Sequence, residues 1–260
     1  MIDWIKFPKR SLKPRTTGLT MVLDHGLTVQ RLSDILDNYA ECIDMVKFGW
    51  GTALVTSRIA EKVALCRKHG IHAFLGGTFF ELAHLYRKLD EFEAYHDELG
   101  LDYMEISDGT LAVTRSDKLA AIERFCKRFT VLTEVGGKDN EYIEAPKVWV
   151  ESIRNQLAAG ASIAIAEGRE GGDAGLYRQN NELRTGLVDE IADEIPPERM
   201  LWEAPLKGQQ GWFIKRFGAD VNLGNIHPDH MVSLETLRYG LRKETLIFFH
   251  GGVPTGGPRS

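Results

Sequence analysis

The chain alternates short apolar runs of strand length with segments in which apolar residues recur every three or four positions. Each apolar run ends in polar or glycine-containing turn residues, and the helical spacing follows. Continuous apolar runs of this length are typical of strands in a parallel sheet that is covered on both sides. The predicted strands are 18–24, 44–48, 71–75, 102–107, 129–135, 162–167, 199–204 and 220–224. The pattern therefore predicts an α/β protein of eight strand-helix units.

Eight such units favour a (β/α)8 TIM barrel with a parallel eight-stranded sheet, because every strand then has a covering helix and the sheet has no free edge. A chain of 260 residues with 43% hydrophobic residues is long enough for one such domain. We expect a single barrel over residues 1–250, with a short basic N-terminal leader, and a disordered tail over 251–260. An open doubly wound sheet is the alternative, although no Gly-x-Gly-x-x-Gly run joins a strand to a helix.

Composition excludes several classes of protein. The formal net charge is -5 and the basic residues are dispersed, which disfavours a nucleic-acid or anionic-membrane partner. Cys42, Cys66 and Cys126 are far apart and form no disulfide framework or Cys-x-x-Cys site. No apolar run is long enough to span a bilayer, and the N-terminus lacks the apolar core of a signal peptide. We therefore expect a soluble cytoplasmic protein.

Charged residues end six of the predicted strands, on the side where the loops of a barrel form its active face. Four consecutive strands end in glutamate. On strand 102–107, Tyr103, Glu105 and Ser107 share one face, which side-chain alternation would direct into the barrel. Glu134 and Glu203 share faces with leucines in the same way, whereas Glu167 shares its face with isoleucines. The strand-end residues are Asp24, Lys47, Glu105, Glu134, Glu167 and Glu203.

Several carboxylates in one barrel mouth repel one another and lose hydration, so a divalent cation or facing basic side chains must offset the charge. Oxygen ligands favour Mg²⁺ or Mn²⁺. The alternative is that the glutamates form ion pairs with Lys47, Lys138 or Arg169 inside the barrel. The candidate metal ligands are Asp24, Glu105, Glu134, Glu167 and Glu203.

Basic and amide side chains on the same loops suit an anionic substrate. Lys138 follows strand 129–135, Arg169 lies in a glycine-rich loop, and Lys207 follows strand 199–204. Loops after the seventh and eighth strands of barrels often bind phosphate through backbone amides. The candidate substrate-binding residues are Lys207, Gln209, Gly224, Asn225 and Ser107. We interpret His227 and His230 as surface histidines, because no third metal ligand is evident.

Many of these residues lie in motifs that resemble the phosphosulfolactate synthases of coenzyme M and sulfolactate biosynthesis, over nearly the whole chain. The motifs are Gly18-Leu19-Thr20 with Asp24, Val46-Lys47-Phe48-Gly49-Trp50-Gly51-Thr52, Gly76-Gly77-Thr78 with Glu81, Glu105-Ile106-Ser107-Asp108-Gly109, Leu132-Thr133-Glu134-Val135-Gly136, Glu167-Gly168-Arg169-Glu170, Glu203-Ala204-Pro205, Gln209-Gln210, Val221-Asn222-Leu223 and Ser233-Leu234-Glu235-Thr236-Leu237-Arg238.

The resemblance implies a barrel lyase of the carbon-sulfur class that uses Mg²⁺ to add sulfite to C3 of phosphoenolpyruvate, through a metal-stabilised enolate, giving 2-phospho-3-sulfolactate. It implies that Lys138 donates the proton to C2 and that Arg169 and Lys207 hold the sulfite and phosphate groups. We place Lys138, Arg169 and Lys47 in the catalytic set. It also implies a homo-oligomer, such as a trimer.

The sequence departs from the family pattern at His25 and Gly137, where lysines are usual, and in the loop around 172–174. Two alternatives stay open. One is a related barrel lyase or isomerase that acts through a metal-stabilised enolate on another phosphorylated or carboxylated substrate. The other is a non-catalytic protective protein, since the family resembles a plant heat-stress-associated protein. Lys138 and the four strand-end glutamates are retained, which argues against the second.

Overall fold

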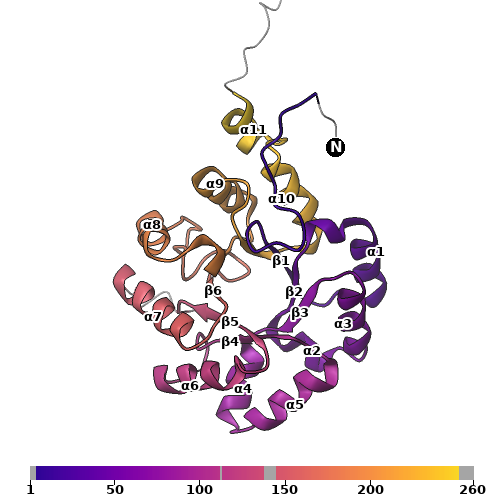
Figure 1. Ribbon diagram of the computed structural model, residues 1–260, viewed down its shortest axis with the longest axis vertical. Helices are drawn as coiled ribbons and strands as arrows, with labels where there is room; N and C mark the ends of the chain where they lie inside the picture. The colour runs from indigo at the N-terminus through magenta and orange to yellow at the C-terminus, as the bar shows by residue number, and fades with distance from the viewer. Residues whose placement is uncertain (1–3, 112, 138–144, 252–260) are drawn as a thin grey trace, which may run out of the picture.

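The computed structural model describes residues 4–111, 113–137 and 145–251. Eight parallel strands form a nearly closed barrel, with helices around its outside (Figure 1), which confirms the predicted (β/α)8 fold. The expected disordered tail lies, apart from Gly251, outside the described residues. The strands are β1 (Thr20–Asp24), β2 (Met45–Phe48), β3 (His72–Leu75), β4 (Tyr103–Ile106), β5 (Thr130–Val135), β6 (Ile163–Ala166), β7 (Met200–Glu203) and β8 (Leu223–Ile226).

The strand order is β3-β2-β1-β8-β7-β6-β5-β4, and each hydrogen-bonded pair is parallel. The first strand thus pairs with the last, as in a barrel and unlike an open doubly wound sheet. The two ends of this order, β3 and β4, lie side by side without ladder hydrogen bonds. Side chains connect them instead, since the ring of His72 stacks on that of Tyr103 at 4.2 Å between centroids. We call this junction the β3–β4 seam.

Each strand is followed by at least one helix, as the alternating pattern predicts. Two helices follow β3, because Arg87 takes a left-handed conformation with φ of 56° that ends the first one. The helices are α1 (Val29–Tyr39), α2 (Thr52–Val55), α3 (Ile59–Lys68), α4 (Thr78–Leu85), α5 (Leu89–Leu99), α6 (Arg115–Phe125), α7 (Pro146–Ala158), α8 (Thr185–Glu194), α9 (Lys207–Phe217), α10 (Met231–Arg238) and α11 (Lys243–His250).

The barrel interior is filled by apolar side chains rather than open. Met21, Phe74, Leu132, Ile165 and Leu201 form a layer across it, and each is fully buried. The layer is packed so closely that a Cβ on Gly224 would lie 2.3 Å from a methyl group of Leu201. The two ends of the barrel are therefore separated from each other by packed side chains.

Strand eight begins three residues later than predicted. Gly224, the last residue of the predicted strand 220–224, and Asn225 after it both lie inside β8. Gly224 leaves room for the side chains of Leu201 and Met21 in the barrel interior. Asn225 takes a φ of 53° within the strand. Asn222 lies just before the strand, where its side chain accepts from the amide of Leu19 at 2.9 Å and donates to the carbonyl of Met200 at 3.0 Å.

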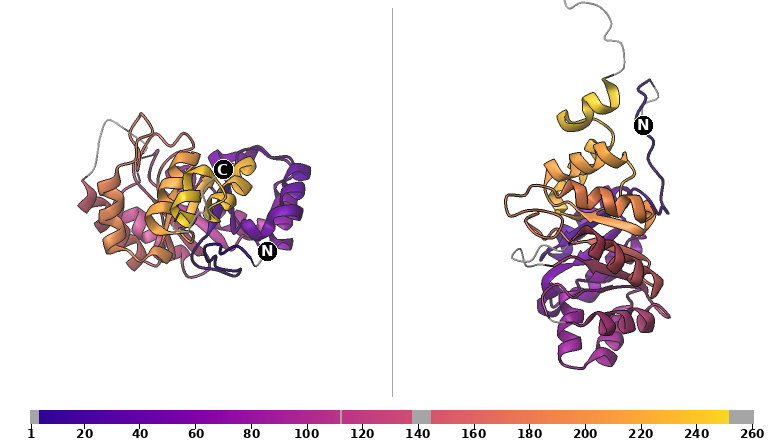
Figure 2. Two further views of the ribbon diagram at one scale, coloured as in Figure 1. Left: turned by 90° about the horizontal axis from the view of Figure 1, so that it is seen from above. Right: turned by 90° about the vertical axis from the view of Figure 1, so that its left-hand side faces the viewer.

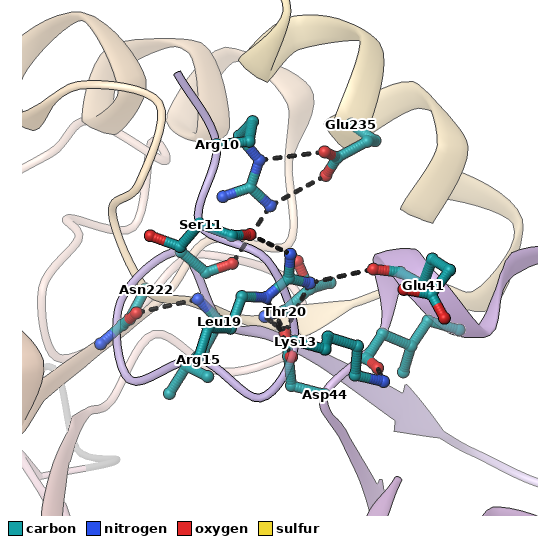
Figure 3. A network of polar contacts seen from close by, with 12 residues as sticks. Arg10, Ser11, Lys13, Arg15, Leu19, Thr20, Glu41, Asp44, Asn222 and Glu235 are labelled. Carbon is teal, nitrogen blue, oxygen red and sulfur yellow. Dashed lines mark hydrogen bonds and ion pairs between the residues drawn. The ribbon is translucent and has the colours of Figure 1, made fainter. Parts of the chain in front are cut away.

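The basic leader packs against the N-terminal end of the barrel. It runs beside α10 and α11 (Figure 2), and the ring of Phe7 lies 5.8 Å from that of Tyr239. Arg10 forms an ion pair with Asp220 at 2.5 Å. It forms a second one with Glu235 at 2.9 Å, which Figure 3 shows. These contacts join the start of the chain to its last two βα units. Within the described ranges, no helix is both long and apolar enough to cross a membrane.

Candidate active site

A cavity of about 280 Å³ lies at the C-terminal ends of the strands, where a barrel fold places its active site. Strand ends supply charged side chains to it, and the loops after β2, β3, β4 and β6 supply the rest of its wall. The lining residues are Leu23, Lys47, Gly49, Trp50, Gly76, Gly77, Thr78, Glu105, Thr110, Glu134, Glu167, Arg169, Glu170, Glu203 and Asn225. All four strand-end glutamates therefore meet in one place, as the sequence predicted.

Lys47 lies at the centre of these carboxylates. Its Nζ is 2.9 Å from Glu105 Oε2, 3.2 Å from Glu134 Oε2 and 3.4 Å from Glu203 Oε1. The four side chains are at most 9% exposed. The ion-pair interpretation is thus confirmed for three of the glutamates, with Lys47 as their common partner. We call these four residues the Lys47 cluster.

The Lys47 cluster contains three glutamates and one lysine, and this excess of carboxylates shifts the pKa values of Lys47 and Glu105. Burial alone would lower the pKa of Lys47, but Glu105, Glu134, Glu203 and Glu167 together raise it well above its usual value. Burial raises the pKa of Glu105 to about 7, with Lys47 opposing the rise and Glu134 adding to it. Lys47 is therefore a fixed cation, whereas Glu105 exchanges its proton near neutral pH.

Backbone amides complete the carboxylate contacts. Gly77 N donates to Glu105 Oε1 at 2.6 Å, and Gly168 N donates to Glu203 Oε2 at 2.9 Å. Arg169 N donates to Glu167 Oε1 at 2.6 Å. Gly77 also has no room for a Cβ, which would collide with Ser107 and Glu105. The glycines that follow the strands thus allow the main chain to approach the glutamates closely.

Asp24, predicted as a metal ligand, does not line the cavity. It faces the helix layer, where its Oδ2 lies 2.6 Å from Nζ of Lys62 in α3 and its Oδ1 accepts from the amides of Gly26 and Leu27. Leu23 faces the cavity in its place. The expectation failed because both faces of β1 carry apolar residues, so alternation did not reveal which face points inward.

Ser107 is buried beside the cavity and donates its hydroxyl to Glu81 of α4. The same buried carboxylate accepts from the amides of Gly109 at 3.1 Å, Thr110 at 3.0 Å and Leu111 at 2.6 Å. Glu81 therefore holds the loop that brings Thr110 to the cavity. It was missed as a site residue. A lone glutamate within the apolar run 78–85 was the available signal, because an unpaired carboxylate is rarely buried.

Of the predicted anion-binding groups, Arg169 lines the cavity and Lys207 does not. Lys207 begins α9 and forms an ion pair with Glu244 of α11 at 2.6 Å. Gln209 also lies outside the cavity wall. Its Oε1 accepts from the amide of Leu206 at 3.0 Å, and its Nε2 donates to the carbonyl of Gly172 at 3.1 Å. Gln209 thus caps α9 and anchors the glycine-rich loop.

The two predicted residues of β8 lie at different depths. Asn225 lines the cavity, whereas Gly224 faces the apolar layer of the interior below it. Lys138, the predicted proton donor, lies outside the described residues. Another lysine does contact the site from behind: Lys118 of α6 donates to the carbonyl of Glu134 at 2.6 Å and to Asp108 at 2.7 Å. Lys118 thereby fixes the end of β5.

The same cavity offers carboxylate oxygens that could bind a metal ion. Among the described residues, no three histidine, cysteine or acidic side chains are arranged to hold a metal ion by themselves. Mg²⁺ is commonly held by one or two carboxylates, with substrate oxygens completing its shell. Glu134 and Glu167 are cavity-lining oxygen donors, and this set fits that mode of binding. His227 and His230 lie on the surface, with their rings 5.1 Å apart.

Comparison with known proteins shows which family the chain belongs to. A model of the family described as (2R)-phospho-3-sulfolactate synthase matches residues 8–244. The chain is 40% identical over 246 residues to a phosphosulfolactate synthase of Bacillus subtilis, covering 94% of this chain and 98% of that protein. It is 41% identical over 245 residues to one of Methanothermobacter thermautotrophicus, covering 92% and 95%.

Among solved structures, 3-hexulose-6-phosphate synthase from Salmonella typhimurium is similar in fold, with a TM-score of 0.54 at 10% identity, over 86% of this chain and all of that one. That likeness concerns the barrel alone. The extended sequence identity agrees with the site, where four glutamates of the family motifs line one cavity and three of them contact Lys47. The chain belongs to the phosphosulfolactate synthase family of enzymes.

Proposed function

We propose that the chain adds sulfite to C3 of phosphoenolpyruvate, with Mg²⁺, to form 2-phospho-3-sulfolactate, and so acts as a lyase of the carbon-sulfur class. The observation that carries the proposal is the Lys47 cluster beside Arg169 in a cavity of about 280 Å³, in a member of this family. A cavity of that size suits a three-carbon substrate better than a sugar or nucleotide.

In the proposed reaction, the sulfur lone pair of sulfite forms a bond to C3, and the C2–C3 π electrons move through C2 into the substrate carboxylate. A proton must then reach C2. Both substrates are anions entering a mouth that already contains carboxylates, so the positive side chains decide where they bind. Arg169 is exposed at the cavity wall and is the side chain suited to hold one of them.

The proton donor in this proposal is Lys138, which follows Gly137 in the sequence and lies outside the described residues. Lys47 has a different role. Its pKa is raised well above the usual value by the surrounding glutamates, so it retains its proton and acts as a fixed charge. It holds three carboxylates in position while the negative charge moves within the substrate.

Glu134 and Glu167 are the residues that would hold Mg²⁺. Bound there, the ion would supply positive charge for the developing negative charge on the substrate carboxylate. Glu105 and Glu203 remain occupied with Lys47 and with the amides of Gly77 and Gly168. These contacts fix the orientation of both carboxylates at the base of the cavity.

The test is incubation of the protein with phosphoenolpyruvate, sulfite and Mg²⁺, with detection of the sulfonated, phosphorylated product by mass spectrometry. Product formation that requires all three components is expected. Lys138→Ala should abolish it, whereas Lys147→Ala, an exposed lysine of α7, should leave it unchanged. If the wild-type protein forms no product, the proposed reaction is wrong. If Lys138→Ala remains fully active, the proton donor is another group.

A screen of other nucleophiles with phosphoenolpyruvate separates this proposal from a related barrel lyase. Sulfite should be the preferred nucleophile. If another nucleophile gives a faster turnover, the Lys47 cluster is still the proposed active site, but sulfite is not its substrate.

A further inference from the structure

A second and larger cavity, of about 490 Å³, lies at the opposite, N-terminal end of the barrel. Its apolar surface comes from Leu19, Met45 and Ile163, the lowest side chains of the barrel interior. The fully buried layer that includes Phe74 and Leu132 separates it from the active-site cavity. We call it the N-terminal cavity. It shares no lining residue with the active site.

Three basic side chains from distant segments line this cavity: Lys13, Arg15 and Arg199. Lys13 donates to the carbonyls of Ala40 at 3.0 Å and Ile43 at 2.5 Å. Figure 3 shows Lys13 and Arg15 side by side on the leader, with Arg15 directed to Asp44.

Arg199, the last residue of η3 (Pro197–Arg199), reaches the β5–β6 side of the cavity. It donates to the carbonyls of Ala161 at 2.7 Å and Ser162 at 2.6 Å. Within the described part of the chain, no carboxylate lies within 4.0 Å of the charged nitrogens of Lys13 or Arg199, whereas Arg15 has Asp44 at 2.9 Å. Two cations of the cavity are thus held by carbonyls alone.

Carbonyl dipoles orient a cation without neutralising it, and Asp44, whose charge acts on Lys13, already pairs with Arg15. Burial lowers the pKa of Lys13, which is the response of an ammonium that has lost hydration faster than it has gained negative partners. An anion entering the cavity would restore that balance. Two carboxylates, Asp44 and Glu198, also line the cavity, so its three basic side chains leave one net positive charge. That excess favours a negatively charged ligand.

The wall of the cavity selects for shape. His72 and Tyr103 stack across the β3–β4 seam with an interplanar angle of 28°, and both line the cavity. Beside the apolar floor, they offer a flat surface for a ring or a hydrocarbon body. We propose that the N-terminal cavity is a second ligand site, which binds a small organic anion with an aromatic or apolar body and holds its charged end between Lys13 and Arg199.

The test uses 2-naphthoate as the probe and 2-naphthamide as its uncharged match, titrated into the full-length protein by calorimetry. Saturable binding of one naphthoate per chain is expected. The amide should bind at least about tenfold more weakly, because it lacks the charge-assisted contact. Lys13→Gln should lower the affinity for naphthoate by about tenfold, and Lys13→Arg should keep the wild-type affinity. Lys9→Gln, an exposed lysine on the same leader, is the matched control and should change nothing.

Two further variants locate the site. Ser162 lines the cavity from just before β6, far from the leader that carries Lys13. Ser162→Phe should fill the cavity with a larger side chain and abolish naphthoate binding. Circular dichroism verifies that this variant keeps its fold. Arg169→Gln, in the active-site cavity, should leave naphthoate binding unchanged. The proposal is overturned if neither probe binds, if the amide binds as tightly as the acid, or if Lys13→Gln and Ser162→Phe both bind like the wild type. It is also overturned if Arg169→Gln alone removes binding, since the probe then occupies the active site. None of these outcomes depends on the catalysed reaction.

Discussion

The two ends of the barrel use opposite chemistry to hold their buried charges. At the C-terminal end, carboxylates accept from backbone amides: Glu105 from Gly77, Glu203 from Gly168 and Glu167 from Arg169. At the N-terminal end, basic side chains donate to backbone carbonyls, as Lys13 does to Ala40 and Ile43. Arg199 and the fully buried Arg238 of α10 do the same.

The direction of the chain explains this difference. In a βα barrel every helix begins near the C-terminal end of the strands and ends near their N-terminal end. Free amides and the positive ends of helix dipoles therefore gather at one end, and free carbonyls at the other. The main chain thus favours one sign of buried side chain at each end without excluding the other, since Asp44 is buried at the N-terminal end. Lys47, Lys62 and Lys118 are buried cations at the C-terminal end, and of these three only Lys47 lines the active-site cavity.

The largest expected effect comes from removing that cation. Lys47→Met leaves three buried carboxylates without their common partner, so the free energy of unfolding should fall by about 3–5 kcal/mol in urea denaturation. Adding Glu105→Gln to this variant should recover part of the loss, because one negative charge is then removed. A loss below about 1 kcal/mol for Lys47→Met would mean that water or ions already neutralise the cluster.

Removal of Glu81 tests whether amide-held carboxylates matter at the C-terminal end. Glu81→Ala leaves the amides of Gly109, Thr110 and Leu111 without their acceptor, and we expect a loss of about 3 kcal/mol in unfolding free energy. Product formation should fall as well, because Thr110 would no longer be held at the cavity. Glu81→Gln, which keeps one acceptor oxygen, is the matched control and should lose less of both.

The charge state of Glu105 gives a dependence on pH. Its pKa is raised by burial from 4.5 to about 7, so between these values the folded protein binds a proton that the unfolded chain has released. Stability should therefore fall as pH rises, by about 2 kcal/mol between pH 5 and 7. Glu105→Gln should lack this contribution. Parallel urea titrations of the two proteins at both pH values measure the difference, and an identical pH slope would contradict it.

A smaller effect is expected from removing a carboxylate at the N-terminal end. Asp44→Asn weakens the contact with Arg15, but Arg15 also donates to the carbonyls of Ser11 and Glu41, so the cost in unfolding free energy should be about 1 kcal/mol. Thermal unfolding measures it. A cost as large as that of Lys47→Met would show that carbonyls alone do not hold cations at this end.

Much of the C-terminal end could be predicted from the sequence, because strand ends in a barrel converge whatever the helices do. A glutamate directly after an apolar run, as in Glu134 and Glu203, was therefore enough to place it at the mouth. Contacts that depend on which face of a strand points inward could not be predicted from the sequence. Asp24 and Leu23 alternate on a strand that is apolar on both faces, and only the packing of α3 shows which one turns inward.

The N-terminal cavity was not predictable for a different reason. Its basic residues come from the leader and from a turn before β7, with no spacing to connect them. Lys207 failed as a predicted cavity residue in a related way, because its partner Glu244 lies on a later helix. Pairings between distant segments are set by tertiary packing, which the local pattern around a lysine does not record.

The β3–β4 seam has a consequence for how the chain could be rearranged. Read from β4 through β8 and then from β1 to β3, every one of the seven ladders joins strands that are neighbours in the new order. The leader and α11 already lie side by side (Figures 1 and 2), with the ring of Phe7 6.3 Å from that of His250, so a linker that replaces the residues outside the described range could join Trp4 to Gly251. A circular permutant that starts after Arg87, between α4 and α5, would thus keep all its strand pairings without a chain crossing the seam.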